Sequence, residues 1–206
     1  MAVRSKESTG RARGQARPPV KERLLNVATR LFARHGFEGT SVQDIVDAAG
    51  VTKGAMYHYY GSKDDLLYEV YHQLLTMQTS RLEEIAAGPG TPEERLRAAA
   101  ADVITTSLDN LDDMIVFFRS LHMLPEDKQT QIRAERRLYH DRFKALVEEG
   151  VAAGAFRADI PADIVVHYFL SVVNQLGSWF KPDGALSPAD VGQQFTELLV
   201  GGLATG

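Results

Sequence analysis

A run of small, polar and cationic residues at positions 52–55 has the chemistry needed to meet a phosphate. Thr52 supplies a hydroxyl, Lys53 a cation, and Gly54 and Ala55 almost no side chain. Small residues let a backbone approach a phosphate closely, and the N–H groups at the start of a helix favour negative charge. The sequence therefore predicts a phosphate-binding helix tip at residues 52–55.

The residues that follow this tip divide between a core side and an outer side. Met56 and Tyr60 lie four residues apart, so on a helix both point back to the core. The donors on the outer side are Tyr57, His58 and Tyr59. Lys63 follows the helix at a position suited to a backbone phosphate. Tyr57 could equally be core packing, and His58 fits a polar residue facing a groove better than a metal ligand.

Cap signals on both sides of the tip predict three short helices. Apolar residues recur at helical spacing from Val20 until Gly36, a glycine suited to end a helix. Ser41 with Asp44 three residues later is a capping signal, so Ser41 fits a helix cap better than a base reader. Gly50 ends the second helix, and Thr52 begins the third. A glycine turn between the second and third helix is the layout of a helix-turn-helix.

The charge of the chain is unevenly distributed. The whole protein has 206 residues and a net charge of −4, yet residues 1–63 hold 11 Lys and Arg against 5 Asp and Glu. Residues 1–18 are rich in Arg, Gly, Ser and Pro, and we interpret them as a disordered basic arm. An acidic protein with a basic front end predicts that only the front end meets a polyanion. A merely solvated tail is the alternative for the arm, but Lys53 and Lys63 lie inside the motif.

The same region carries a family resemblance on a dense set of residues. They are Gly36-Phe37, Thr40-Ser41-Val42, Asp44-Ile45, Ala48-Ala49-Gly50-Val51, Lys53-Gly54, Met56-Tyr57, Tyr59-Tyr60, Ser62-Lys63 and Leu66. This pattern resembles the DNA-binding domain of the tetracycline-repressor (TetR) family over residues 20–67. The family has phenylalanine where Tyr60 stands, and commonly a threonine or serine at the position of Ala55.

The resemblance implies a homodimeric transcriptional regulator, usually a repressor, that binds a palindromic operator in double-stranded DNA. Lys53 and Gly54 would enter the major groove, where Lys53 would read the O6 and N7 atoms of guanine. The residues expected to hold phosphates are Thr40, Thr52, Tyr57, Tyr59 and Lys63. On this basis residues 19–63 are the DNA-binding domain.

Residues 64–206 are expected to form a larger helical domain for ligand binding and dimerisation, which completes an all-α fold. Gly88 to Pro92 interrupts the helical pattern, and further helices are predicted over residues 92–108, 109–123, 125–153, 161–180 and 188–203. The last two have broad apolar faces and are the expected homodimer contact, as a four-helix interface. Alternatively, these faces only complete the core of one subunit.

Apolar, aromatic and polar residues in this second domain predict a cavity for a small molecule. The candidate ligand-binding residues are Met114, Phe117, Phe118, Leu121, Tyr139, Phe143, Tyr168, Asn174 and Trp179. Aromatic and methionine side chains at helical spacing are also common in ordinary cores. The helix predicted over residues 63–87 joins the two domains and is the expected switch.

The segment from Gly177 to Phe195 resembles a narrower TetR subgroup. Its regulators control fatty-acid, aromatic-acid and sterol-ring degradation and sense acyl-CoA thioesters. The resemblance implies an acyl-CoA effector, with cations such as Arg119, Arg133, Arg136, Arg137 or Lys181 meeting its phosphates. Surface ion pairs explain these arginines equally well, and we favour that alternative for Arg133 and Arg136.

Other function classes find little support in the sequence. Cysteine is absent, no two histidines lie three or four residues apart, and no apolar run approaches the roughly 20 residues of a membrane span. We therefore expect no metal, no cofactor, no membrane contact, a cytoplasmic location and no enzyme activity. The open alternatives are a TetR-like dimer that senses another hydrophobic ligand or obeys a protein partner and, remotely, an all-helical enzyme.

Overall fold

The computed structural model describes residues 18–205, and the regular structure of this range is helical. The helices are α1 (Val20–His35), α2 (Val42–Ala49), α3 (Lys53–Tyr59), α4 (Lys63–Ala86), α5 (Pro92–Asp109), α6 (Leu111–Ser120), the 3₁₀ turn η1 (Leu121–Met123), α7 (Glu126–Ala152), α8 (Ala162–Asn174), α9 (Leu176–Trp179) and α10 (Pro188–Leu203). The predicted all-α fold is confirmed. Apart from Pro18, the basic arm predicted for residues 1–18 lies outside the described residues.

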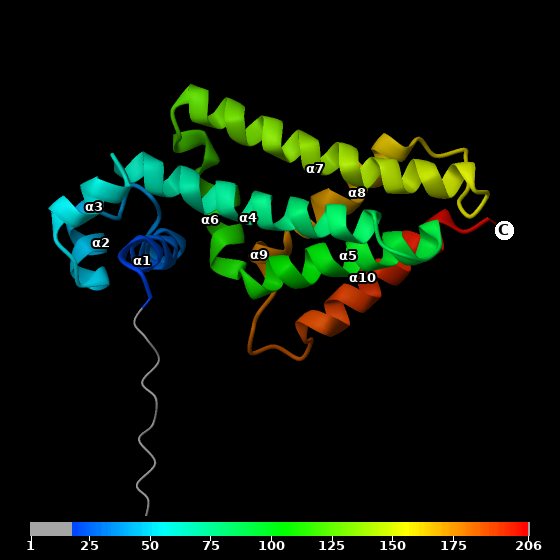
Figure 1. Ribbon diagram of the computed structural model, residues 1–206. Helices are drawn as coiled ribbons and strands as arrows, with labels where there is room; N and C mark the ends of the chain where they lie inside the picture. Colours follow the sequence, from blue (N-terminus) through cyan, green and yellow to red (C-terminus); the bar gives the residue numbers. More distant parts are fainter. Residues whose placement is uncertain (1–17, 206) are drawn as a thin grey trace, which may run out of the picture.

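Helices α1–α3 form a small bundle at one end of the molecule (Figure 1). The Ser41 hydroxyl accepts a hydrogen bond from the Asp44 N–H at 3.1 Å, and the Asp44 carboxylate accepts one from the Ser41 N–H at 2.8 Å. Gly50, between α2 and α3, has a φ of 62°, a conformation that glycine adopts without steric cost. Local residues thus begin and end each helix of the predicted helix-turn-helix.

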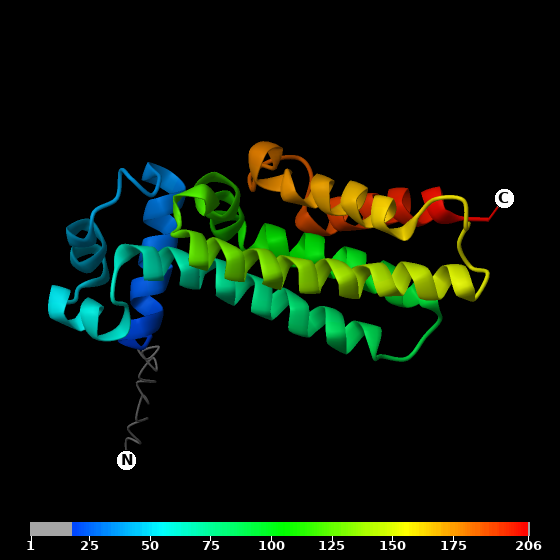
Figure 2. The same cartoon turned by 90° about the horizontal axis from the view of Figure 1, so that it is seen from above.

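Three long helices run side by side away from this bundle (Figures 1 and 2). Helix α4 packs against both α5 and α7, while α10 lies along α5 and α8 lies along α7. The C-terminus lies at the far end from α1–α3. None of the helices in residues 18–205 combines the length and the apolar character needed to cross a bilayer.

Two predicted helices are interrupted in the structure. The helix predicted over residues 109–123 is α6 followed by the 3₁₀ turn η1, and the helix predicted over 161–180 is α8 followed by α9. At Gln175 the N–H bonds to the carbonyl of Val172, three residues back, which tightens the chain into a turn. Beyond this turn, Gly177 lies against Ile115 of α6. Gln175, where the helix is interrupted, is neither glycine nor proline, and the apolar residues continue past it. The sequence therefore did not indicate the interruption.

The buried apolar side chains form two clusters, and their boundary does not follow the predicted domains. The first cluster joins α1–α3 to the first half of α4, to Met114, Val116 and Phe117 of α6 and to the start of α7. The second joins the second halves of α4 and α7 to α5, α8, α9 and α10. The predicted division into residues 19–63 and 64–206 therefore does not coincide with a division of the core. Helix α6 shares its packing with the helix-turn-helix.

Candidate nucleic-acid interface and ligand cavity

The tip of α3 is exposed, and its backbone is accessible from outside. The Thr52 hydroxyl caps the helix by accepting a hydrogen bond from the Ala55 N–H at 3.1 Å. Lys53 and Gly54 are exposed. A Cβ atom built on Gly54 would meet only Thr52 Oγ1, at an ordinary 3.8 Å. Packing among the described residues thus gives no reason for glycine here, whereas close approach of an external phosphate would.

The larger side chains in and just after α3 divide as the spacing predicts. Met56 is fully buried and Tyr60 nearly so, whereas Tyr57 and Tyr59 are 52% and 45% exposed. The ring of His58, also exposed, lies edge-on against Tyr59, with 4.9 Å between ring centroids. The exposure of Tyr57 favours an outward-facing role over core packing.

Tyr60, where the family has phenylalanine, contacts the start of α1. Its hydroxyl donates to the carbonyl of Lys21 at 3.3 Å, and the Lys21 ammonium lies 5.9 Å from the centre of its ring. Burial raises the pKa of the Tyr60 phenol to about 12, with the carboxylate of Glu69 acting in the same direction. The extra hydroxyl therefore stays protonated and links α1 to the end of α3.

Two residues predicted to hold phosphates are instead engaged inside the domain. Thr40 is only 2% exposed, and its hydroxyl donates to the carbonyl of Gly36 at 2.8 Å. The Lys63 ammonium donates to the carbonyls of Phe37 and Thr40 at 2.8 and 2.9 Å and lies 4.1 Å from the centre of the Phe37 ring. The predicted contact of the Thr40 hydroxyl does not fit this burial. Lys63 retains one N–H for a phosphate.

Ser41 takes the capping role that its spacing favours. Its hydroxyl and its N–H both donate to the carboxylate of Asp44, and these bonds hold the pKa of that carboxyl below its usual value. The hydroxyl therefore stabilises the start of α2 and is not free to read a base.

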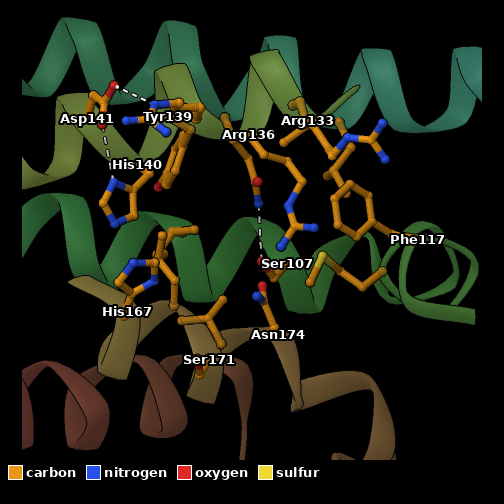
Figure 3. Close-up of a pocket in the computed structure, with 18 of the residues that line it drawn as sticks. Ser107, Phe117, Arg133, Arg136, Tyr139, His140, Asp141, His167, Ser171 and Asn174 are labelled. Atoms are coloured by element: carbon orange, nitrogen blue, oxygen red, sulfur yellow. Dashed lines mark hydrogen bonds and ion pairs between the residues drawn. The ribbon is translucent and has the colours of Figure 1, made fainter. Parts of the chain in front are cut away.

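A cavity of about 760 Å³ lies between α4, α5, α6, α7 and α8 (Figure 3). Its apolar wall consists of Leu74, Leu75, Val103, Met114, Phe117, Phe118, Tyr139, Leu170 and Val173. Its polar and charged wall consists of Gln78, Ser107, Arg133, Arg136, Arg137, His140, Asp141, Lys144, Asp163, His167, Ser171 and Asn174. An apolar wall together with convergent polar groups suits a small organic molecule.

The cavity brings together only part of the predicted ligand-binding set. Met114, Phe117, Phe118, Tyr139 and Asn174 line it, so these five are well placed. The other four predicted residues, Leu121, Phe143, Tyr168 and Trp179, do not line it.

These four residues lie in three different environments. Phe143 is fully buried and stacks on Phe169, with ring centroids 5.4 Å apart, so it belongs to the second core. Leu121 packs against the first core. Tyr168 and Trp179 are exposed and line a separate shallow hollow on the outer face of α8 and α9.

Several polar residues of the cavity are not among the predicted ligand-binding residues. Gln78 is buried and donates to the hydroxyls of Thr106 and Ser107 at 3.3 and 3.1 Å. Gln78 follows Leu74 by four residues, and Ser107 follows Val103 by four, so both lie on the apolar stripe of their helix. A polar side chain on such a stripe is the signal that would have indicated them.

Arg136 does not form the expected surface ion pair. Its side chain is partly buried and lines the cavity, while Arg133 is exposed at the rim. Burial lowers the pKa of the Arg136 guanidinium. Arg119 and Lys181, also named as phosphate partners, do not line the cavity.

The histidines of the cavity do not assemble a metal site. The ring centroids of His140 and His167 lie 4.7 Å apart, and His140 also contacts Asp141. Among residues 18–205, however, no group of three or more histidine and carboxylate side chains has a geometry that could hold a metal ion.

The cavity wall is connected to the helix-turn-helix through α6. The Tyr71 hydroxyl of α4 donates to the Val116 carbonyl of α6 at 2.9 Å, and its ring lies edge-on to Phe117 with 5.0 Å between centroids. Phe117 lines the cavity, and on its other side α6 packs against α1. A ligand that touches Phe117 therefore touches an element held by both α1 and α4.

Comparison with known families decides the class of the protein. Residues 24–70 match the bacterial regulatory proteins of the tetR family, and residues 89–203 match the tetracyclin repressor-like C-terminal domain. The second match alone covers more than half of the chain. The chain belongs to the TetR family. It is a ligand-responsive, DNA-binding transcriptional regulator, and the residues of its helix-turn-helix predicted the DNA-binding role. TetR regulators bind operator DNA and small-molecule effectors and act as dimers.

Individual TetR proteins resemble the chain over nearly its full length. The HTH-type transcriptional repressor KstR2 of Mycolicibacterium smegmatis is 29% identical, over 89% of this chain and 90% of the relative. The structure of the regulator PfmR from Thermus thermophilus has a TM-score of 0.82 at 28% identity, over 89% of this chain and all of the other. AibR, solved in complex with isovaleryl coenzyme A and operator DNA, has a TM-score of 0.74 at 26% identity, over 90% of this chain and 98% of the other.

Proposed function

We propose that this TetR regulator is a homodimeric repressor that is released from a palindromic operator by an acyl-CoA thioester. In this proposal residues 19–63 bind the operator, and residues 64–206 bind the thioester and form the dimer. The observation that carries it is the cavity beside α6. The cavity is apolar in part and lined by cations, and α6 itself packs on α1.

The DNA contact rests on the tip of α3. Lys53 and Gly54 are exposed at a helix N-terminus, where backbone N–H groups and a cation favour a phosphate or a guanine edge. Exposed Tyr57 and Tyr59, with the Thr52 and Ala55 backbone, flank this tip and are suited to phosphates. In KstR2 and PfmR the names describe a transcriptional repressor and a transcriptional regulator, which supports the same role here.

The effector class rests on the composition of the cavity. Its apolar wall suits an acyl chain, and exposed Arg133 and Arg137 at the rim suit phosphates. Two carboxylates line the cavity against four arginine and lysine side chains, so an anionic ligand is favoured. The isovaleryl coenzyme A named for AibR supports a thioester as the ligand.

The switch follows from the position of α6. A ligand shifts an equilibrium only through a difference in its affinity for two states. A ligand that contacts Met114 and Phe117 favours the state in which α6 has moved, and α6 contacts α1 directly and α4 through Tyr71. Movement of α1 and α4 changes the distance between the two α3 tips of a dimer, which must match half-sites roughly 34 Å apart.

Operator binding and release can be tested with a duplex selected by the protein from a random 20-bp library. Fluorescence anisotropy measures the affinity for this duplex, with and without a panel of CoA thioesters, free CoA and free acids. We expect sub-micromolar affinity and release by at least one thioester, together with a rise in melting temperature of the DNA-free protein. Failure to select any duplex would refute the regulator mechanism. Release by a free acid but by no thioester would refute only the effector class.

A further inference from the structure

Arg136 is a partly buried arginine without a hydrogen-bonding partner in the described chain. Arg95, which is also partly buried, donates to Glu149 at 2.6 Å and to the carbonyl of Ala86 at 2.7 Å. Within residues 18–205, no hydrogen bond or ion pair joins Arg136 to any side chain or carbonyl. A partly buried charge without an opposite charge is costly to fold around. Its N–H groups are therefore available to an anion that enters the cavity.

The guanidinium of Arg136 is held in place by a contact that leaves its N–H groups free. It lies over the ring of Phe117, 5.3 Å from the ring centre. A cation over an aromatic face uses the π-surface of the ring and none of the five N–H donors. Figure 3 shows Arg136 pointing from α7 into the space between Phe117, Ser107 and Asn174.

The groups around Arg136 add donors to this space. Ser107 accepts from Gln78, and in the described residues no hydrogen bond uses the Ser107 hydroxyl as donor. The Asn174 amide lines the same space and, within residues 18–205, has no hydrogen-bond partner. A guanidinium, a hydroxyl and an amide are together complementary to a carboxylate, which guanidinium binds through two parallel hydrogen bonds.

The two carboxylates that line the cavity are already paired elsewhere. Asp141 contacts Arg137 at 3.8 Å and His140 at 3.3 Å. Asp163 contacts Lys144 at 3.4 Å and lies 3.9 Å from His140. Neither is bonded to Arg136, so the anion that Arg136 lacks is not supplied from within the cavity.

We infer that the effector carries a carboxylate on its acyl portion, and that Arg136 binds this carboxylate in the interior of the cavity. The inference rests on the proposed function for the location of the ligand. It adds that the ligand is anionic at both ends: an acyl chain ends in a carboxylate at Arg136, and phosphates remain at the exposed rim near Arg133 and Arg137. A monothioester of a dicarboxylic acid has this chemistry.

Matched pairs of thioesters test the inference. Hexanoyl-CoA and adipoyl-CoA have the same acyl length and differ in the terminal carboxylate, as do octanoyl-CoA and suberoyl-CoA. We expect the carboxylate-bearing member of at least one pair to bind the wild-type protein about tenfold or more tightly in calorimetry. Arg136→Met should abolish this preference, whereas Arg133→Met, a control one turn away and exposed, should keep it.

Three outcomes would overturn the role of Arg136. In the first, wild type binds both members of every pair alike; in the second, the preference survives in Arg136→Met. In the third, Arg136→Met weakens the binding of free CoA as much as that of the thioesters, which would assign the guanidinium to the phosphates.

Free adipate and suberate, with hexanoate and octanoate as controls, separate this inference from the effector class. Should no thioester bind while a free dicarboxylate binds wild type and not Arg136→Met, the thioester proposal fails and Arg136 keeps its role. Should no probe of any kind distinguish Arg136→Met from wild type, the inference fails even if thioesters release the operator. Circular dichroism and melting temperature confirm that each variant is folded.

Discussion

At the scale of single residues, the fold does not require a glycine at position 54, whereas it uses the charge of Lys63. Gly54 occupies a helical position where no described neighbour requires the absence of a Cβ. Lys63, in contrast, uses its charge within the domain, where it joins the loop before α2 to the start of α4. Substitutions at these two positions therefore separate what the fold needs from what the DNA needs.

Gly54→Ala should stabilise the protein and weaken operator binding. Alanine is better than glycine in a helix by roughly 0.5–1 kcal/mol, and the new Cβ has space within the domain. The same Cβ would hold the backbone away from a phosphate, so affinity should fall on the order of tenfold, or about 1.4 kcal/mol. Urea unfolding and fluorescence anisotropy measure the two effects.

A reverse substitution on α5 is the control for Gly54→Ala. Ala98 is exposed and remote from α3, so Ala98→Gly should lower stability and leave operator affinity unchanged. Unchanged operator affinity in Gly54→Ala would contradict the close approach of the α3 backbone to DNA.

Lys53→Ala and Lys63→Met should affect different measurements. Lys53 is exposed, and its side chain bonds to no other described residue, so its loss should leave stability within about 0.5 kcal/mol. The slope of log affinity against log salt should fall by up to about one, and sequence preference should relax. Lys63→Met removes two charged hydrogen bonds and should cost about 2 kcal/mol of unfolding free energy. If Lys63→Met keeps a normal melting temperature and lowers the salt slope, Lys63 binds a phosphate, as the sequence predicts.

The sequence predicted local features of the fold and site well, because each depends on neighbours in the chain. The capping box of Ser41 and Asp44, the turn at Gly50 and the exposed tip at Lys53 all lie within a few residues. Thr40 and Lys63 interact across 23 residues, so no local pattern indicates that they bind each other. Which face of α7 turns inward also depends on distant packing, so no local pattern indicates that Arg136 lines the cavity.

At the scale of elements, α6 is the part of the fold that meets both the cavity and the helix-turn-helix. It is bonded to α4 through Tyr71 and packed against α1, and Met114 and Phe117 expose it to a ligand. It also carries a partly buried acid in its first turn, Asp113. Two predictions concern this helix, one on coupling and one on pH.

Tyr71→Phe should weaken the coupling between ligand and operator. The substitution removes the hydrogen bond to Val116, which should cost about 1 kcal/mol of stability. Tyr71 does not line the cavity, so ligand affinity of the DNA-free protein should be unchanged. The ratio of operator affinities with and without ligand should approach one. An unchanged ratio would show that α6 acts on α1 and not through α4.

Asp113→Asn should stabilise the protein above pH 6. Burial raises the pKa of Asp113 from 3.8 to about 6, and the charge of Asp112 acts in the same direction. Between about pH 4 and 6 the folded protein binds a proton that the unfolded chain has lost, so stability falls as pH rises through this window. The loss at neutral pH is at most about 3 kcal/mol.

Unfolding by urea at several pH values between 4.5 and 7.5 tests this pH dependence. The variant should be the more stable form at pH 7.5 and should lose the slope below pH 6. Asp109→Asn, at the exposed end of α5, should behave as wild type. An identical pH slope in wild type and Asp113→Asn would remove Asp113 as its cause.

At the scale of the whole molecule, the apolar residues of α8 and α10 divide between the second core and the outer surface. Val165, Phe169, Val191 and Leu199 are buried in the second core, as the core-only interpretation expected. Other apolar residues of these helices face outward, and two of them, Tyr168 and Leu198, are 64% and 67% exposed. The ring of Trp179 contacts Phe195, one turn before Leu198, so the outer surface is continuous from α9 to α10. Exposed apolar residues on adjoining elements favour a contact with a second copy.

Leu198→Glu should therefore convert the protein to a monomer without unfolding it. In a dimer formed through this surface, a glutamate would be buried unpaired, yet at this exposed position it costs the single subunit little. Light scattering should show half the mass. Because a monomer contacts only one half-site, the salt slope of operator binding should fall to about half. Leu138→Glu, at another exposed leucine, on α7, is the matched control and should remain dimeric. A dimeric Leu198→Glu variant with an intact salt slope would move the subunit contact away from α10.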